Sequence, residues 1–419
     1  MRVNLNRNKN KGIYPHHRKL KFPDNSIIFL PLFFFLTVSL GFAQDFGLVL
    51  NQKAELKDGE KSYGAIEYTG TVLPWFSMPL GDKADLYLSG GFSAEYIDDE
   101  WKPLPEIYRF EYMYNFRPGL RLEIGRLSSW ENSYVMAGLF DGASFRLNIG
   151  GGRLSGGVFY TGLLYKKSAY IVMSPEDRTD YDSKDVYFAS RRLAAGVKWE
   201  CTGIFDTRNT LVVSGAAQFD LNGNDTLFHS QYLQANLSIP LGGRVNVGFG
   251  GVIELVEKTG ENFYTAFAGS TEIQWMLPTA LQDRFSFTGW FSSGNWNGRV
   301  GVFIPLTMQA RGKVLRPECS GIALLEAAYT VRIHPKFATD VSGAYYFRTD
   351  TVTFYHSDIN PISNSPLLGG EIYGGLTWTP FSDVLISTGG GVFFPRTGKV
   401  FTDNADIIYR VSLTASISF

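Results

Sequence analysis

The chain ends in Arg410-Val-Ser-Leu-Thr-Ala-Ser-Ile-Ser-Phe419, where polar and apolar residues alternate without a break. Successive side chains of a β-strand point to opposite faces, so this segment has one face for water and one for an apolar surrounding. The same alternation occurs at residues 108–116, 233–239 and 323–333. The sequence therefore predicts a protein built from two-faced strands.

The length of these segments indicates where the apolar face lies. Strands of soluble sheets usually have five or six residues, whereas a strand needs about 9 to 11 residues to cross a bilayer. The alternating segments match the longer class. After the first 43 residues no apolar run is long enough for a membrane helix, so strands must do any spanning. A large secreted β-sandwich, whose strands also alternate, is the alternative.

Residues 1–43 have the charge order of a secretory signal peptide. Seven Lys and Arg residues precede Ile27 to Leu40, which is almost wholly apolar, and Gly41-Phe42-Ala43 supplies the small residues of a cleavage site. We expect cleavage after Ala43, which leaves residues 44–419 as one barrel domain. An uncleaved anchor is the alternative, because the apolar stretch is nearly long enough to span a membrane.

The composition of residues 44–419 excludes two classes of protein. Without the leader's seven bases and one acid, the totals of 39 and 40 fall to 32 and 39, a net charge of −7. A protein that coats nucleic acid shows the opposite balance, so no nucleic acid partner is expected. Cys201 and Cys319 are too few for a disulfide scaffold, and we expect them at opposite ends of the barrel.

Two kinds of connection alternate between the predicted strands. The short ones, rich in Pro, Gly, Asp and Asn, lie at Pro79–Lys83, Arg117–Gly119, Gly150–Gly152, Thr202–Arg208, Leu241–Gly243, Leu277–Gln282, His334–Lys336 and Pro380–Ser382. The longer ones lie at Glu55–Ser62, Asp98–Pro105, Leu127–Gly138, Lys166–Lys184, Asn222–Thr226, Glu257–Glu261, Gly294–Cys319, Thr349–Pro366 and Pro395–Ala405. Short turns face the periplasm and long loops the outside in bacterial barrels.

The count of connections sets the fold class. Nine loops and eight turns predict eighteen strands, with sixteen as the alternative count, and place both termini in the periplasm. The fold expected is all-β, a transmembrane up-and-down antiparallel β-barrel. Its first strand begins at Asp45, which leaves no room for a plug domain after the leader.

Two stretches resemble outer-membrane porin families related to the alginate-export channel. Gly119-Leu-Arg-Leu-Glu-Ile-Gly-Arg126 with Leu139-Phe-Asp-Gly-Ala-Ser-Phe145 is similar to that group's Gly-Arg strand end and Asp-Gly hairpin entry. Leu368-Gly-Gly-Glu-Ile-Tyr373 and Phe393-Phe-Pro395 are similar to its closing segments, except that Arg396 stands where a Gly is expected. The resemblance implies an 18-stranded barrel and alginate-like polyanions among the candidate solutes.

The terminal Phe419 concerns the destination of the chain. A final Phe on an alternating strand resembles the signal that outer-membrane assembly machinery recognises. We therefore expect the bacterial outer membrane as the location, with its lipids and the assembly machinery as partners. The sequence does not indicate the oligomeric state.

The polar face of the strands supplies the residues expected to line a pore. The basic ones are Arg109, Arg121, Arg146, Arg192, Lys198, Arg244, Arg284, Arg332, Arg348 and Arg410. The acidic ones are Glu111, Glu123, Glu200, Glu272, Glu326, Asp340 and Glu371. Ten bases against seven acids predict a modest preference for anions, unless these residues simply pair across neighbouring strands.

The loops at 166–184 and 294–319 are long enough to fold inward and narrow the lumen. The first contains Glu176, Asp177, Asp180 and Asp182, and Asp185 follows directly after it. Oxygen-rich spacing of this kind can hold Ca²⁺, but a solvated acidic loop is the favoured interpretation. No cofactor or metal site is predicted.

Tryptophans are expected at the membrane interface where they face lipid, as at Trp75, Trp199, Trp275, Trp290 and Trp378. Trp101, Trp130 and Trp296 belong to loops, where Trp101 and Trp296 offer a surface on which a sugar could stack.

Catalytic arrangements are hard to find in the predicted mature chain. It contains three histidines, His229, His334 and His356, and their spacing supports no nucleophile and base pair. His229-Ser230 is the weak candidate for a hydrolase. We expect no enzyme but a porin-like channel for passive diffusion or export of small hydrophilic solutes, anionic or saccharide. The alternative is a structural or adhesive surface barrel with a blocked lumen.

Overall fold

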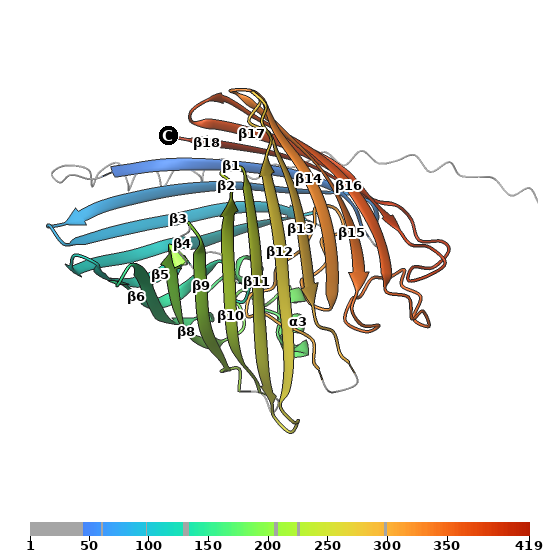
Figure 1. The fold of residues 1–419 in the computed structure, drawn as a ribbon, viewed down its shortest axis with the longest axis horizontal. Coiled ribbons are helices and arrows are strands. Elements are labelled where there is room, and N and C mark those ends of the chain that lie inside the picture. The colour runs from blue at the N-terminus through green and yellow to red at the C-terminus, as the bar shows by residue number, and fades with distance from the viewer. Residues whose placement is uncertain are drawn as a thin grey trace, which may run out of the picture. The chain divides into compact units, whose positions relative to one another are not determined.

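The computed structural model describes residues 45–419, except 60, 61, 98, 129–133, 205–207, 224–226 and 297–299. The predicted signal peptide and Trp130 lie outside the described residues. In the described part, eighteen antiparallel strands each pair with their neighbours in sequence, from β1 (Asp45–Gly59) to β18 (Ile408–Ser418). β1 also pairs with β18, so the sheet closes into an up-and-down barrel (Figure 1). The predicted fold class and the count of eighteen strands are confirmed.

The bounds of the remaining strands follow. They are β2 (Ser62–Leu80), β3 (Ala84–Ile97), β4 (Glu100–Arg117), β5 (Leu120–Ser128), β6 (Leu139–Ile149), β7 (Gly152–Tyr160), β8 (Arg192–Thr202), β9 (Thr210–Asp220), β10 (Phe228–Leu241), β11 (Val245–Lys258), β12 (Tyr264–Met276), β13 (Arg284–Ser292), β14 (Ile322–His334), β15 (Phe337–Arg348), β16 (Leu367–Phe381) and β17 (Val384–Pro395). Two short helices, α2 (Lys166–Ala169) and α3 (Pro175–Asp182), lie between β7 and β8. Among the described residues, no helix has the length and apolar character needed to cross a membrane.

All eight predicted short turns are confirmed, because each falls where one strand ends and the next begins. The turn between β6 and β7 illustrates the chemistry. Gly150 and Gly151 have φ angles of +51° and +81°, a region that side chains with a Cβ rarely adopt. Two consecutive positive φ angles give the type of turn whose twist suits a tight hairpin.

Two of the nine predicted long loops are wrong. β1 runs to Gly59 and β2 starts at Ser62, while β4 starts at Glu100 and continues through Pro105. The polar sequences there belong to strands of 14 to 19 residues. Because about 9 to 11 residues suffice to cross a bilayer, the ends of these strands project into water, where both faces can be polar.

The predicted alternation of faces is confirmed over most of the barrel. In β14, Leu325 is 48 % exposed on the outer surface, whereas Leu324 is 3 % exposed and packs inside. In β18, Val411 and Leu413 are exposed, whereas Arg410 pairs with Glu55 across the closing seam. The outer surface therefore presents apolar side chains along nearly every strand.

Within the alternating segment 108–116, the pattern predicts Tyr108 on the outer, apolar face, and this prediction is wrong. The ladder between β3 and β4 shifts register at Ser89 and Gly90 and leaves Tyr108 unpaired, as in a β-bulge. The Tyr108 hydroxyl lies 3.3 Å from Oγ of Ser93, a buried side chain. One extra residue on one strand reverses the alternation beyond it, which simple period-two counting cannot anticipate.

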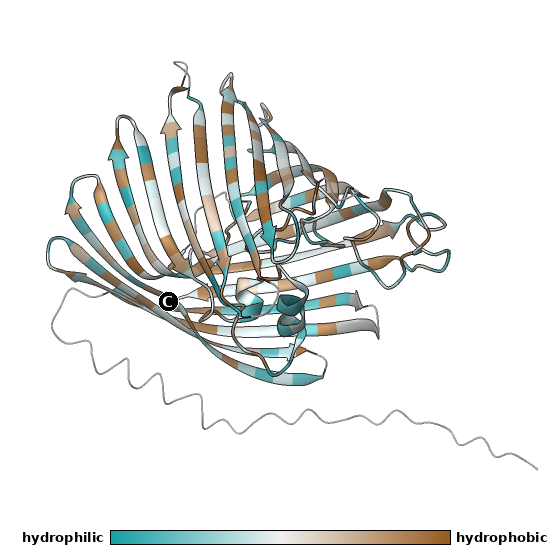
Figure 2. Ribbon diagram, turned by 90° about the horizontal axis from the view of Figure 1, so that it is seen from below, coloured by the Kyte–Doolittle hydropathy of each residue, from teal (hydrophilic) through white to brown (hydrophobic). Residues whose placement is uncertain are grey.

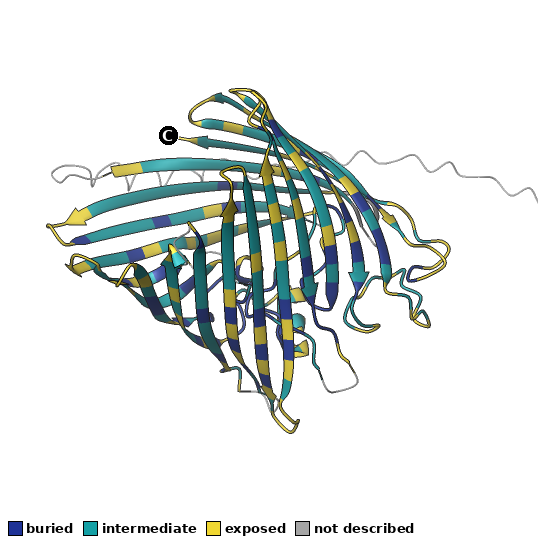
Figure 3. Ribbon diagram, viewed as in Figure 1, coloured by how far each residue is buried: buried dark blue, intermediate teal, exposed yellow. Residues whose placement is uncertain are grey.

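The buried apolar core lies inside the barrel, in the half that carries the long loops. Wall residues such as Phe140 and Tyr232 pack there against Ile171, Phe303 and Leu306 from loops. Figure 2 shows the two helices and several loop segments within the ring of strands. Figure 3 shows buried positions gathered toward the strand ends that bear these loops. The interior of this half is thus a packed protein core as well as a passage.

Candidate pore and its constriction

Aromatic residues mark two levels on the outer surface. Trp275 and Trp378 are exposed near the strand ends that carry the short turns, whereas Trp290 is buried. Phe267 and Trp296 contact each other near the opposite rim, with ring centres 5.7 Å apart. Trp275 and Phe267 are eight positions apart on β12, which is roughly 27 Å along a strand. With a tilt of about 40° this becomes about 20 Å, close to the apolar band of outer-membrane barrels.

Trp101 lies near the tip of β4, at the end of the barrel that carries the long loops. Its ring lies 5.3 Å from the ring of Tyr96 and 5.8 Å from the ring of Tyr68. Trp101 and Trp296 are therefore members of aromatic clusters at the rim. Both rings pack against other aromatic side chains.

Basic residues of the predicted lining gather on β4 to β8. Arg121, Arg146 and Lys198 lie in one row across this wall, with Ser155 between the last two. Acidic partners accompany them, since Arg121 and Arg146 lie 2.9 and 3.4 Å from Glu123. The side chain of Arg146 nevertheless remains 47 % exposed inside a closed barrel. Arg121 thus pairs within β5 and Arg146 pairs across strands, and both side chains still face water.

Two further ion pairs complete this basic wall. Arg109 lies 2.7 Å from Glu111, and Glu200 lies 3.0 Å from Arg153. Arg153 was missing from the sequence prediction, although its place in the alternation of β7 points to the same face. It is as exposed as Arg146.

Acidic residues gather on the wall formed by β12 to β16. Glu272, Glu326 and Glu371 lie in one row, with Thr288 and Ala344 between them. β6 and β14 are eight strands apart in a ring of eighteen, so the acidic and basic walls face each other across the lumen.

Four other predicted residues lie nearer the end of the barrel that carries the short turns. Arg244 lies in the turn before β11, and Arg332 is exposed at the end of β14. Arg284 and Asp340 share one row through Thr330 and are half-buried.

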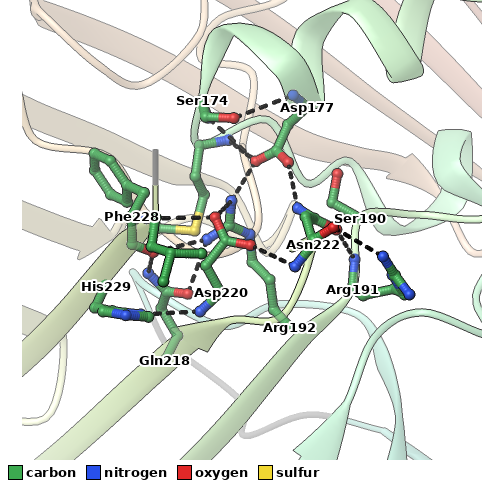
Figure 4. A network of polar contacts seen from close by, with 12 residues as sticks. Ser174, Asp177, Ser190, Arg191, Arg192, Gln218, Asp220, Asn222, Phe228 and His229 are labelled. Carbon is green, nitrogen blue, oxygen red and sulfur yellow. Dashed lines mark hydrogen bonds and ion pairs between the residues drawn. The ribbon is translucent and has the colours of Figure 1, made fainter. Parts of the chain in front are cut away.

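Arg192 does not contact water in the lumen, because its side chain is 0 % exposed. Its guanidinium donates to Asp177 of α3 at 2.6 Å, lies 3.3 Å from Asp220, and donates to Gln218 at 3.0 Å (Figure 4). Asp177 also accepts the Ser174 N–H as part of the capping box that starts α3. Arg192 thus anchors the loop of residues 161–191, which we call the helical loop.

Arg348 is likewise buried. It donates to the carbonyl oxygen of Ser365 at 2.9 Å and to that of Ser363, so it holds the β15–β16 loop (residues 349–366).

The loop of residues 293–321 enters the lumen and is bound at two buried carboxylates. We call it the hairpin loop, since Ala310 pairs with Glu318 near its tip. Glu254 of β11, fully buried, accepts the Ile304 N–H at 2.8 Å and the Ser230 hydroxyl at 3.0 Å. Alternation along β11 places Glu254 inward, but the sequence prediction overlooked it.

Glu371 of β16 forms the second attachment. Its carboxylate accepts the N–H groups of Lys313, Val314 and Leu315 at 2.7, 3.0 and 3.0 Å. Gly312 precedes them with φ of +83°, and a Cβ there would collide with the Tyr346 hydroxyl. Glu371, predicted to line the pore, therefore positions the loop that narrows it.

A third inward segment follows β5. The Tyr134 N–H donates to Gln234 at 3.0 Å, and the Tyr134 hydroxyl lies 2.6 Å from Oγ of Ser270. Thr307 of the hairpin loop exchanges hydrogen bonds with this segment, since its Oγ1 accepts the Ala137 N–H at 2.7 Å.

The helical and hairpin loops also bind each other. The Met308 N–H donates to the Tyr170 carbonyl at 2.8 Å, and the Tyr170 hydroxyl donates to Glu318 at 2.7 Å. Burial, and then the neighbouring Glu318 carboxylate, raise the pKa of Tyr170, so its phenol remains a proton donor. The predicted inward folding of both loops is thus what the structure shows.

A cavity of about 670 Å³ remains between the hairpin tip and the wall. Its lining combines Tyr134 and Trp290, the loop residues Arg311 and Lys313, and wall carboxylates that include Glu326. This is the polar space next to the constriction.

The other sequence candidates are placed as follows. Nδ1 of His229 accepts the Asp220 N–H, while the Ser230 hydroxyl donates to Glu254, so these two side chains do not act on each other. Cys201 and Cys319 are both free. Within the described residues, no group of three or more His, Cys, Asp or Glu side chains is arranged to hold a metal ion.

Comparison with known proteins shows the fold. No protein-family profile matches the chain, and no curated protein sequence matches it. Among solved structures, OccK2 (OpdF) of Pseudomonas aeruginosa in complex with glucuronate is 14 % identical, with a TM-score of 0.61 over 90 % of this chain and 99 % of that one. The outer membrane protein opdK of the same organism is 13 % identical, with a TM-score of 0.59 over 90 % and 100 %.

A third structure, P. aeruginosa OpdQ, is 12 % identical, with a TM-score of 0.58 over 90 % of this chain and 99 % of that one. The relation to the alginate-export channel stays a resemblance of sequence motifs. The chain is similar in fold to the 18-stranded outer-membrane porin structures of the OprD and Occ group.

Proposed function

We propose that this protein is an outer-membrane channel through which small hydrophilic solutes diffuse past three inward loop segments. The observation that carries the proposal is the exposure of charged side chains inside a closed barrel, since Arg146 and Arg153 are each 47 % exposed there. Charged groups on an inner wall require water around them. The fold shared with porins supports the same function.

The basic wall favours anionic solutes, including carboxylated sugars. One structure of similar fold was solved with glucuronate, a solute of this class. Arg146, Arg153 and Lys198 line one recess of the lumen together with Glu123 and Glu200. Reconstituted protein in a salt gradient should give a reversal potential of anion-selective sign, and Arg146→Glu should move it toward cation selectivity. An unchanged reversal potential in this variant would show that the basic wall does not determine ion selectivity.

The location and assembly route are part of the same proposal. Phe419 is exposed, and its backbone N–H and carbonyl bond to Leu48 at 2.9 and 3.1 Å, at the seam where the barrel closes. Recognition of this residue by assembly machinery predicts that removing Phe419 lowers the amount of folded protein in outer-membrane fractions. Refolding of the purified variant in detergent should be much less affected.

An adhesive surface barrel is the second candidate, favoured by the β15–β16 loop. Val352, Tyr355 and Ile362 in that loop are 70 %, 82 % and 86 % exposed, which leaves apolar side chains available to a partner. Liposome swelling separates the two functions. Sugar-driven swelling supports the channel, whereas absence of swelling together with loop-dependent binding to cells supports adhesion.

A further inference from the structure

Ile304, in the first arm of the hairpin loop, is held at both of its backbone polar groups. Its N–H donates to Oε2 of Glu254 at 2.8 Å, and its carbonyl accepts the Tyr232 hydroxyl at 2.8 Å. Tyr232 and Glu254 are paired across β10 and β11, and the Ser230 hydroxyl lies 3.0 Å from the other oxygen of Glu254. The adjacent Phe303 is 0 % exposed. We call these three wall side chains the Ile304 clasp.

Glu254 occupies this clasp without a cation. Its side chain is 0 % exposed, and no Lys, Arg or His of the described chain forms an ion pair with it. Arg192, the cation on the neighbouring part of the wall, already pairs with two carboxylates of its own. Glu254 accepts one backbone N–H, whereas Glu371 accepts three. A negative charge on Glu254 is therefore poorly compensated.

The other titratable groups that face Glu254 are phenols. They are Tyr232 of β10 and Tyr264 of β12, and burial raises the pKa of both, so they stay neutral near pH 7. Glu254 pairs with Ala266, one residue beyond Phe267 at the loop-bearing rim, which places it outside the apolar band. Glu254 is thus the group of the clasp whose charge can change near neutral pH.

Opening of the clasp changes the proton affinity of Glu254. Burial raises its pKa to about 8 in the closed loop, and contact with water returns it toward the ordinary value of 4.5. The closed loop keeps a proton that the open loop releases. Rising pH therefore favours opening between about 4.5 and about 8, by at most roughly tenfold per pH unit, and adds nothing above that window. The neutral form suits the closed clasp, since Oε2 still accepts the Ile304 N–H while the proton on Oε1 bonds to Ser230.

We propose that the Ile304 clasp is a pH-dependent attachment of the hairpin loop, which holds the first arm of the loop against the wall while Glu254 is neutral and releases it as Glu254 ionises. The tip of the loop stays attached through Glu371. Release of the arm widens the lumen in alkaline medium. This effect on conductance rests on the proposed channel function, whereas the movement of the loop does not.

The native thiol of Cys319 reports the movement. It is 0 % exposed and donates to Sδ of Met308 at 3.8 Å, within the same loop. Full-length protein in lipid nanodiscs is treated with a charged maleimide between about pH 5 and about pH 9, with Cys201→Ser present throughout to remove the other free thiol. Every thiol reacts faster as pH rises, so each rate is divided by that of a peptide of residues 314–324.

The normalised rate should rise at least about tenfold from pH 5 to pH 8 and then level off. Glu254→Gln, whose amide stays neutral and keeps an acceptor for Ile304, should hold the low rate at every pH. Tyr232→Phe, which removes the second bond without changing charge, should raise the rate and keep its dependence on pH. Glu261→Gln, at an exposed carboxylate of the next loop, is the matched control and should behave as the wild type.

A normalised rate that does not change with pH in the wild type would overturn the pH-dependent attachment. The same conclusion follows if Glu254→Gln retains the wild-type rise, or if Glu261→Gln abolishes it. Planar-bilayer conductance over the same pH range should rise in the wild type and stay constant in Glu254→Gln. A labelling rate that rises with pH in a protein that passes no current at any pH would support the attachment and overturn the channel.

Discussion

The hairpin loop and the β15–β16 loop both join strands at the same end of the barrel, yet only the β15–β16 loop leaves large apolar side chains almost fully exposed. In the hairpin loop Phe303 and Leu306 are 0 % and 1 % exposed, whereas Tyr355 and Ile362 of the β15–β16 loop are more than 80 % exposed. The hairpin loop is held by Glu254 and Glu371, two buried carboxylates that accept its backbone N–H groups. Inward folding therefore depends on polar anchors in the wall as much as on apolar burial.

Deleting each loop in turn should produce the largest effect, a change in single-channel conductance that differs between the two loops. Replacing residues 302–319 by a short Gly-Ser linker should raise single-channel conductance several-fold, because the removed segment narrows the lumen. Replacing residues 351–364 in the same way should leave conductance nearly unchanged. Equal effects of the two deletions would mean that the hairpin loop does not form the constriction.

Arg192→Ala should give the largest loss of stability. The change leaves Asp177 and Asp220 buried without their cation, and loss of one partner from a buried ion pair costs about 3–5 kcal/mol. Urea unfolding in lipid vesicles measures the free energy. Arg191→Ala is the matched control, since the Arg191 side chain is exposed and bonds to the Asn222 carbonyl. A similar loss in both variants would contradict the anchoring role of Arg192.

Shortening one buried and one exposed side chain compares how much each loop contributes to stability. Leu306→Ala should cost about 3 kcal/mol because it leaves a cavity in a packed core. Ile362→Ala should change stability by less than about 0.5 kcal/mol. The same unfolding assay applies, and a large loss of stability in Ile362→Ala would show that this side chain is packed after all.

Tyr134→Phe should destabilise the protein less than Arg192→Ala or Leu306→Ala. It removes one hydrogen bond, to Ser270, and a bond of this kind contributes about 1 kcal/mol. Conductance should stay close to that of the wild type, because the hairpin loop keeps its other attachments. Tyr355→Phe, at an exposed hydroxyl, should leave stability unchanged and serves as the control.

The sequence predicted the strands of the barrel wall far better than the contacts of the loops that fold into the lumen. Alternation and turn residues identify strands because each strand meets lipid on one side and the lumen on the other, so the pattern is local. A bulge such as the one at Tyr108 defeats it, because a single extra residue leaves no mark in composition. The ends of strands that project beyond the bilayer, as near Pro105, were predicted as loops because neither of their faces is consistently apolar.

The candidate site was predictable only in part for a different reason. Arg146 and Glu326 lie on the expected face, since parity along a strand is enough to place them. Whether an inward residue meets water or a loop depends on contacts across the barrel, between residues far apart in sequence. Arg192 and Glu371 bind loops for that reason, and Arg311 could not be recognised because the hairpin loop has no periodic pattern.

Diffusion through this barrel requires a water-filled path that remains open beside the inward loops. Single-channel recording of the unmodified, full-length protein in a planar bilayer tests this most directly. We predict discrete, stable conductance steps in symmetrical KCl, without any loop being removed. Silence from folded wild-type protein, with steps only after residues 302–319 are removed, would show that the loops seal the barrel and would contradict the account.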